Sequence, residues 1–172
     1  FLYKGYSIQP FSPMAGTGLS SHELNQPGTY QETTDTTVTA QFKTIAESLP
    51  EEIKDEIALY ILAWTTTPWT LPSNTALTIG KKIDYLIIRT FNQYTFKPIR
   101  VLIAKDLIKK QFGEKFIESP SIDSYKPNDK KIPYRIESKH KGSELLGIRY
   151  EKIWSESPVP IENPENAYRI IS

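Results

Sequence analysis

Hydroxyl side chains gather in one short stretch of the sequence, residues 64–74, which reads Trp-Thr-Thr-Thr-Pro-Trp-Thr-Leu-Pro-Ser-Asn. Four threonines, one serine and one asparagine fall within these eleven residues, and none of the eleven carries an ionisable side chain. A hydroxyl both donates and accepts hydrogen bonds, so a cluster of them can hold a small polar ligand together with an attacking water. The stretch predicts recognition by hydrogen bonds rather than acid–base chemistry by side chains.

The element that must position these hydroxyls is the apolar run directly before them, Ile57–Ala63. It is short and continuous and contains β-branched and aromatic residues, which is typical of a buried strand. Pro68 and Pro72 cannot donate to a ladder of backbone hydrogen bonds, so the strand must end near Thr66. We therefore expect the threonines at the end of a buried strand.

The order Trp-Thr-Thr-Thr-Pro-Trp-Thr-Leu-Pro resembles the threonine-rich peptide of the editing domain (connective peptide 1) that is inserted into isoleucyl-tRNA synthetases. Thr67 stands where the related valine and leucine enzymes have the arginine of a Thr-Thr-Arg-Pro core. Upstream, residues 3–24 resemble the segment that leads into the insertion, and residues 35–42 resemble its first strand. The resemblance is specific through about residue 80 and general in pattern afterwards.

The resemblance implies hydrolysis of valine from the tRNA for isoleucine, or of valyl-adenylate. It implies catalytic positions at Thr66, Thr67 and Asn74, which would contact the aminoacyl group or terminal adenosine and position water. Four more positions would bind the substrate or shape its pocket: Thr65, Pro68, Trp69 and Thr70. The implied partners are the 3′ acceptor end of the tRNA and the remainder of the synthetase.

A hydrolytic site separate from the synthetic site would solve a problem of amino-acid selectivity. One methylene is worth only about 1–3 kcal/mol in an apolar pocket, so a synthetic site rejects valine poorly. A pocket sized for valine excludes isoleucine, because overpacking is costly. No serine–histidine pair is present in residues 64–74, which favours direct attack by water over a covalent intermediate.

In the resembled family a glycine-rich segment with a histidine and a following aspartate completes the editing pocket, and nothing in this sequence matches it. Residues 167–172 resemble the strand just before that segment. We therefore expect a connector at residues 1–34 and an incomplete editing domain at residues 35–172. The signatures of adenylate formation are absent too, so we expect no cofactor in this fragment, and ATP and magnesium belong to the synthetic site of the parent enzyme.

Composition agrees with one globular domain. The chain has 172 residues, 38% hydrophobic residues, ten tyrosines and thirteen prolines, which favours sheet and turns over a helix bundle. The lack of cysteine excludes disulfides and thiolate metal sites, and His22 and His140 are too far apart in sequence to favour a metal site. No run approaches the roughly 20 apolar residues that span a bilayer. The missing initiator methionine predicts an excised fragment, which we expect to be cytoplasmic and monomeric, with no membrane partner.

The predicted fold is mainly β (α+β): a partly closed β-barrel of short strands with one or two short helices. One helix is expected at Ala104–Phe112, ended by Gly113, and a helical turn is expected near Pro50 and Glu51. The expected strands are 6–9, 36–43, 57–66, 76–79, 84–91, 100–104, 134–139, 145–154 and 168–171.

Two other functions stay open at this point: a non-catalytic module that docks the tRNA acceptor end, and a β-barrel whose threonines are purely structural. A basic region beside Tyr125 and Tyr134 could attract RNA, although acidic residues nearby dilute its field. Its members are Lys126, Lys130, Lys131, Lys139, His140 and Lys141. The glycines at 16 and 18 predict a turn rather than a phosphate loop, because no P-loop lysine follows them.

Overall fold

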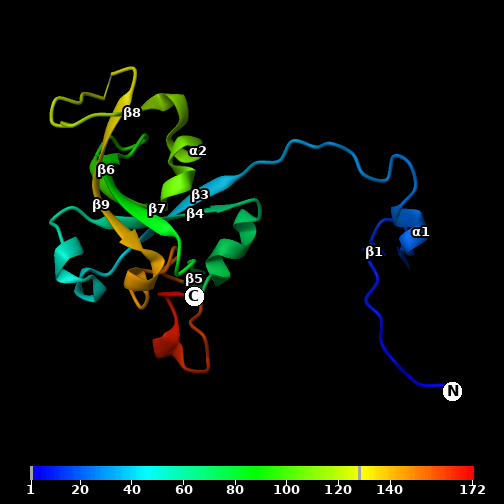
Figure 1. Ribbon diagram of the computed structural model, residues 1–172. Coiled ribbons are helices and arrows are strands. Elements are labelled where there is room, and N and C mark those ends of the chain that lie inside the picture. Colours follow the sequence, from blue (N-terminus) through cyan, green and yellow to red (C-terminus); the bar gives the residue numbers. More distant parts are fainter. Residues whose placement is uncertain (1, 128) are drawn as a thin grey trace. The chain divides into compact units, whose positions relative to one another are not determined.

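Two compact units make up the computed structural model, which describes residues 2–127 and 129–172 (Figure 1). The first ends at Thr36 and the second runs from Thr37 to Ser172. In the first unit, β1 (Phe11–Ser12) pairs with β2 (Thr17–Gly18), and α1 (Ser21–Leu24) follows. The strand predicted at residues 6–9 is wrong: Tyr6 and Ile8 are fully exposed, so the run has no surface on which to pack.

A mixed six-stranded sheet forms the second unit, in the order β3-β4-β7-β6-β9-β8. The pairs β4–β7 and β8–β9 are parallel and the others are antiparallel. Within the described residues β3 and β8 remain separate edges, so the barrel does not close. The predicted mainly β (α+β) class is confirmed. The strands are β3 (Val38–Lys43), β4 (Leu59–Thr65), β6 (Asp84–Phe91), β7 (Pro98–Ala104), β8 (Phe116–Glu118) and β9 (Ile132–Lys141).

A second, two-stranded sheet joins distant parts of the chain. β5 (Ala76–Thr78) pairs in parallel with β10 (Arg169–Ile171), with Leu77 opposite Ile170. Both of these residues are buried in the same core cluster as the first half of β4. The strand just after the threonine-rich peptide is therefore held by the last strand of the chain.

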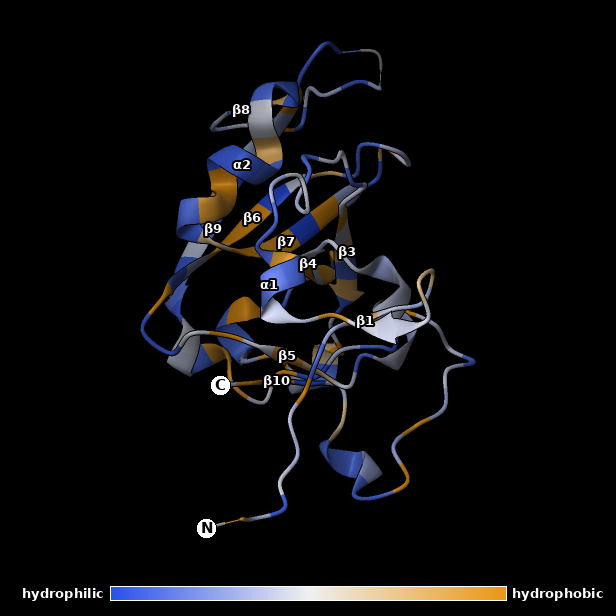
Figure 2. Ribbon diagram, turned by 90° about the vertical axis from the view of Figure 1, so that its right-hand side faces the viewer, coloured by the Kyte–Doolittle hydropathy of each residue, from blue (hydrophilic) through white to orange (hydrophobic). Residues whose placement is uncertain are grey.

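Each face of the large sheet carries its own hydrophobic core, and Figure 2 shows the apolar residues running along β6 and β7. Ile61, Phe42 and Tyr150 belong to one core. Ile88 and Val101 belong to the other, which the helical segment covers. That segment consists of η4 (Lys105–Leu107) and α2 (Ile108–Phe112), as predicted, and Gly113 ends it with a φ of 51°.

The strand predicted at residues 145–154 is wrong. Gly147, with a φ of 83°, breaks the extended chain just after a 3-10 turn. Tyr150 and Arg149 then make only isolated bridges, to Thr44 and Arg169. Alternating burial of Ile148 and Tyr150 imitates a strand, although a core also takes side chains from bends.

The remaining helical elements are 3-10 turns, and the one predicted near Pro50 is among them. They are η1 (Ala46–Ser48), η2 (Glu51–Ile53), η3 (Pro68–Ser73), η5 (Gly113–Lys115), η6 (Gly142–Leu145) and η7 (Pro164–Asn166).

Candidate functional site

Strand β4 leads directly into the threonine-rich peptide, as the apolar run at residues 57–63 predicts. Its partner β3 aligns Val38 with Thr65 and Thr39 with Trp64. Successive side chains of a strand point to opposite faces. Trp64 therefore lies on the α2 side of the sheet, where it contacts Lys110, and Thr65 lies on the other side.

Three of the threonines form a local network at the point where β4 ends. The hydroxyl oxygens of Thr65 and Thr67 are 3.2 Å apart, and the Thr67 backbone N–H donates to the Thr65 hydroxyl over 3.0 Å. The Thr70 hydroxyl donates to the Thr67 carbonyl over 2.8 Å. These bonds fix the backbone of the turn, and they leave donor and acceptor capacity on the hydroxyls.

Proline sets the direction in which the peptide leaves the sheet. Pro68 occupies the first turn of η3, where its missing N–H costs nothing and its fixed φ suits a helical start. The turn leaves Trp69 74% exposed. Thr66 is also exposed, and in the part of the chain that the structure describes its hydroxyl makes no hydrogen bond. Thr66 and Trp69 therefore face solvent.

Asn74 is held at both ends of its amide. Its Nδ2 donates to the Ala76 carbonyl over 2.9 Å, and its Oδ1 accepts from the Tyr150 hydroxyl over 2.6 Å. Burial raises the pKa of the Tyr150 phenol well above its ordinary value, so this hydroxyl stays protonated and keeps donating. The side chain of Asn74 therefore has a fixed orientation, which a sequence gives no means to foresee.

The chain after Asn74 is braced by a segment far along the sequence. The Thr75 carbonyl accepts from the backbone N–H of Tyr168 over 2.6 Å. Tyr168 has a φ of 58°, and its ring meets that of Tyr150 edge-on with centroids 6.2 Å apart. Sequence reasoning missed both tyrosines as supports of the site, because nothing local to either residue reports a contact with residues 74–75.

The predicted site residues thus lie together in space, since they occupy one strand end and the turn that follows. They do so on an open surface. One cavity beside the end of β4 has a volume of about 410 Å³ and includes Trp64 but none of residues 65–70. A second cavity, of about 420 Å³, reaches η3 only through Leu71.

The basic region predicted beside Tyr125 and Tyr134 is partly neutralised. Lys139 and Lys141 both bind the carboxylate of Asp84, over 2.8 and 2.5 Å. His140 contacts Ser138 and lies 3.4 Å from Glu144. This weakens the argument for an RNA surface there.

No cluster of histidine and acidic side chains in residues 2–127 and 129–172 is arranged to hold a metal ion. No helix among these residues has both the length and the apolar character needed to cross a membrane.

The sequence is similar to those of known enzymes along almost its whole length. Over 172 residues the chain is 52% identical to the isoleucine–tRNA ligase of Cytophaga hutchinsonii, and over 171 residues it is 50% identical to that of Bacteroides fragilis. The chain is homologous to a segment of isoleucine–tRNA ligases. The ligase of Porphyromonas gingivalis agrees, with 51% identity over 172 residues.

These matches cover 99% of the chain but only 14% of each of the three ligases. The chain thus corresponds to a small part of a much larger enzyme. No family model matches it.

Proposed function

We propose that residues 35–172 belong to the editing domain of an isoleucine–tRNA ligase and form an incomplete part of it, and that the threonine-rich peptide binds the mischarged valyl end of the tRNA for hydrolysis. In this proposal residues 1–34 connect the domain to the rest of the synthetase. The tRNA acceptor end and the remaining synthetase are the partners, and the work takes place in the cytoplasm, where tRNA is charged.

One observation carries the proposal: exposed hydroxyls stand on a rigid turn at the end of a buried strand. The Thr66 hydroxyl has no partner among the described residues, and the Thr65 and Thr67 hydroxyls are 3.2 Å apart. Fixed donors and acceptors of this kind can hold an ester carbonyl and a water at attacking distance without reorganisation.

The roles divide by position. Thr66 and Thr67 contact the aminoacyl group and orient the water, and Thr65 and Thr70 hold the turn that presents them. Trp69 and Pro68 form a wall beside the amino acid, which sets its permitted size. Asn74 acts at the adenosine or the carbonyl, from a side chain already bound to Ala76 and Tyr150. Residues 64–74 hold no carboxylate for the substrate's ammonium group, so we expect that group to come from another segment of the ligase.

The test uses the whole ligase that contains this segment. Thr66→Val and Thr67→Val keep the side-chain shape but replace the hydroxyl with a methyl group. We expect each to lower kcat for deacylation of valyl-tRNA about tenfold to a hundredfold, the usual effect of one lost hydrogen bond in the transition state. Isoleucine activation should be unchanged. Thr75→Val is the matched control, because Thr75 is exposed just beyond the peptide and its hydroxyl makes no hydrogen bond in the described part.

Unchanged deacylation in both variants would show that the hydroxyls of Thr66 and Thr67 take no part in the hydrolysis. If deacylation persisted while tRNA affinity fell, the segment would be a docking module for the acceptor end instead.

A further inference from the structure

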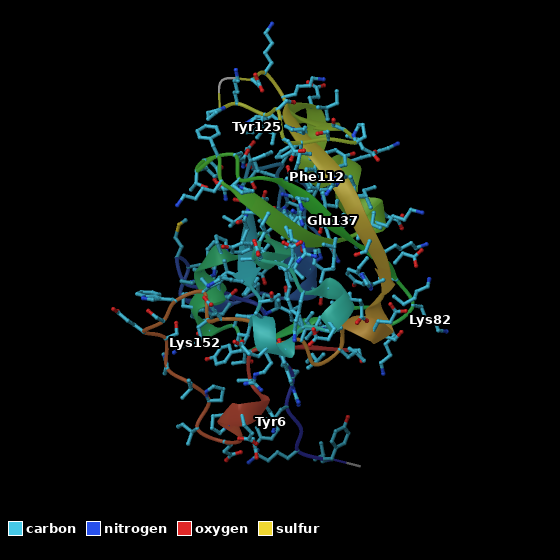
Figure 3. The ribbon with its side chains drawn as sticks, turned by 90° about the vertical axis from the view of Figure 1, so that its left-hand side faces the viewer. Tyr6, Lys82, Phe112, Tyr125, Glu137 and Lys152 are labelled. Atoms are coloured by element: carbon cyan, nitrogen blue, oxygen red, sulfur yellow. The ribbon has the colours of Figure 1, made fainter. Side chains whose placement is uncertain are left out.

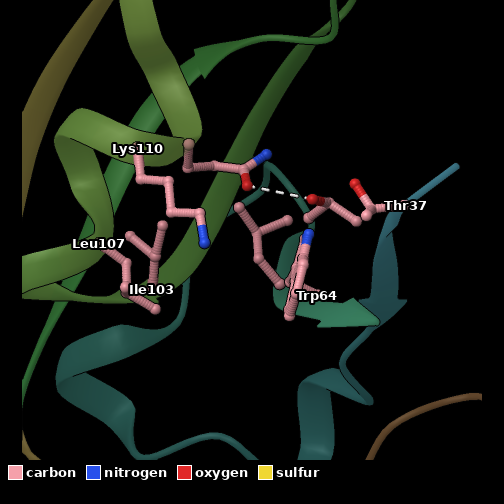
Figure 4. Close-up of a pocket in the computed structure, with 8 residues that line it drawn as sticks. Thr37, Trp64, Ile103, Leu107 and Lys110 are labelled. Carbon is pink, nitrogen blue, oxygen red and sulfur yellow. Dashed lines mark hydrogen bonds between the residues drawn. The ribbon is translucent and has the colours of Figure 1, made fainter. Parts of the chain in front are cut away.

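A groove separates α2 from the edge of the large sheet, on the face away from Thr65. Two cavities, of about 410 and 500 Å³, share Thr37, Thr39, Leu62 and Gln111 in their linings. They are therefore one continuous depression, which we call the α2 groove. Figure 4 shows one end of it, with Lys110 and Leu107 on the helical side, Trp64 on β4 and Thr37 just before β3.

The first end of the α2 groove pairs an indole with a cation. Trp64 is 53% exposed, and the Lys110 ammonium lies 4.6 Å from its ring centre. Lys110 forms no ion pair with any described residue. An unpaired ammonium over an exposed indole offers a charged donor and a flat apolar surface at the same spot.

The rest of the α2 groove has an apolar floor, which includes Phe91, Val101 and Phe112, together with neutral polar groups and a second aromatic residue beside a lysine. Thr39 donates to Gln111 over 3.1 Å, and further amides come from Gln41, Asn92 and Gln93. At the far end lie Tyr94, which is 81% exposed, and Lys115. Neither cavity is lined by a carboxylate.

The helical wall adds positive charge. Residues 105–115 carry four exposed lysines against two exposed carboxylates: Lys105, Lys109, Lys110 and Lys115 against Asp106 and Glu114. An excess of cations beside the groove attracts a polyanion, whereas it gives no advantage to an apolar partner.

We propose that the α2 groove binds a single-stranded stretch of RNA, with one base stacked on Trp64 and the adjacent phosphate on Lys110. Stacking surfaces, lysines and amides along a groove free of carboxylates are the elements by which proteins hold unpaired nucleotides. Lys110 exchanges its contact with the indole for a phosphate oxygen, which is the stronger acceptor. The proposal rests on the proposed function, since the RNA would be the unpaired 3′ end of the tRNA.

The position of Trp64 explains how the end of β4 can serve both RNA binding in the α2 groove and contact with the aminoacyl group at the threonines. Trp64 and Thr65 are neighbours whose side chains point to opposite faces of β4. The groove therefore anchors nucleotides upstream of the terminal one, while the threonines face the aminoacyl group.

The first experiment measures binding of a fluorescein-labelled single-stranded RNA of roughly six nucleotides that ends in CCA, by fluorescence anisotropy, to the 172-residue chain. We expect Trp64→Ala to weaken binding roughly fivefold to a hundredfold, the usual effect of removing one stacked base. Trp64→Phe should retain most of the affinity. Trp154→Ala is the matched control, since Trp154 is 54% exposed but lies outside the groove, and it should bind as the wild type does.

The second experiment follows the salt dependence of the same binding. Lys110→Gln should reduce the slope of log K against log salt concentration by about 0.7, the value for one lost phosphate contact on a single strand. Lys109→Gln, an exposed neighbour that does not line the groove, should leave the slope unchanged.

The proposal is overturned if the wild-type chain binds this RNA no better than a blunt RNA duplex, or if Trp64→Ala and Lys110→Gln both bind it like the wild type. In that case the groove is a contact surface for another protein segment. A separate readout distinguishes this failure from failure of the proposed function. In the ligase, Trp64→Ala should raise KM for valyl-tRNA with little change in kcat, whereas the threonine variants lower kcat. Weakened RNA binding in Trp64→Ala together with inert threonine variants would refute only the editing chemistry.

Discussion

Arg89 and Arg100 lie directly opposite one another on β6 and β7, and a single carboxylate, that of Glu137, binds both of them. One Glu137 oxygen accepts from Arg89 and the other accepts from Nε of Arg100 over 2.7 Å. Arg89 also pairs with Asp55, and Arg100 donates to the Ile53 carbonyl over 2.8 Å. Facing like charges would repel across the strand pair, so Glu137 and Asp55 are what makes this arrangement stable.

A β-bulge puts Glu137 in that position. Ile87 pairs with Ser138 and Ile88 pairs with Ile136, so Glu137 is the extra residue of β9. In a regular strand residues 137, 139 and 141 would share a face. With the bulge, Glu137 turns to the arginines while Lys139 and Lys141 turn to Asp84. Figure 3 shows Glu137 directed inward from β9.

We predict that Glu137→Gln destabilises the fold by about 3–5 kcal/mol, because it leaves the Arg100 guanidinium, whose side chain is only 5% exposed, without a counter-charge. Urea unfolding followed by circular dichroism measures the free energy of unfolding. Glu151→Gln is the control, since it breaks the exposed pair with Lys43 and should have little effect. A loss below about 1 kcal/mol in Glu137→Gln would mean that the arginines find water instead.

Stability should fall in acid partly through Asp84. Hydrogen bonds from Lys139 and Lys141 lower the pKa of Asp84 from 3.8 to about 2. A folded-state pKa below the unfolded value contributes stability that is complete above the unfolded pKa, and this stability is lost as the pH falls from about 4 towards 2. Thermal unfolding midpoints over this range should therefore drop less in Asp84→Asn than in the wild type. Asp106→Asn, which removes an exposed carboxylate with no ion pair among the described residues, should follow the wild-type curve. Identical curves for all three proteins would show that Asp84 does not contribute to the loss of stability in acid.

For Asn74 we expect a cost in stability as well as in activity. Asn74→Ala removes the acceptor of the buried Tyr150 hydroxyl and the donor to the Ala76 carbonyl, which should cost about 1–3 kcal/mol. Tyr150→Phe removes the same hydroxyl contact and leaves the amide in place. If the two variants lower valyl-tRNA deacylation in the whole ligase equally, Asn74 acts by supporting the turn. A much larger loss in Asn74→Ala would indicate direct contact with the substrate.

Gly142 should not tolerate a side chain. A Cβ there would lie 2.2 Å from the Gly80 carbonyl oxygen and 3.2 Å from the Tyr85 ring. Because the nearest atom belongs to the backbone, the two segments must move apart, and we expect Gly142→Ala to cost about 1–3 kcal/mol or more. Ser143→Ala, at the exposed next residue, should stay within about 0.5 kcal/mol of the wild type. The midpoints of thermal unfolding of both variants test this prediction. Equal midpoints would contradict the close approach of Gly142 to the Gly80 carbonyl.

The sequence predicts those parts of the fold that depend on local chemistry. Residues 84–91 form the strand that their β-branched content indicates, and α2 ends at Gly113 as expected. The end of β4 near the prolines is likewise local, so the place of the threonines was predictable.

What escaped prediction depends on distant partners. β8 is three residues long and exists through its parallel pairing with β9. The bulge at Glu137 could not be predicted, because the role of Glu137 depends on the pairing of Arg89 with Arg100 on two other strands. The sequence around Tyr150 indicates a strand. In the structure Tyr150 makes only an isolated bridge, and its buried side chain donates a hydrogen bond to Asn74.

The pairing of β5 with β10 has a consequence for the order of events during synthesis. Asn74 and β5 leave the ribosome early, whereas Tyr150 and residues 168–171, which bind them, come much later. At usual elongation rates the delay is roughly 5 to 20 seconds. Contacts between such distant residues form late and slowly. The nascent chain must therefore hold Asn74 and β5 without their partners for seconds. A chain stopped before Tyr168 would keep the local hydrogen bonds of the threonines but lack the distant contacts that brace the residues after them.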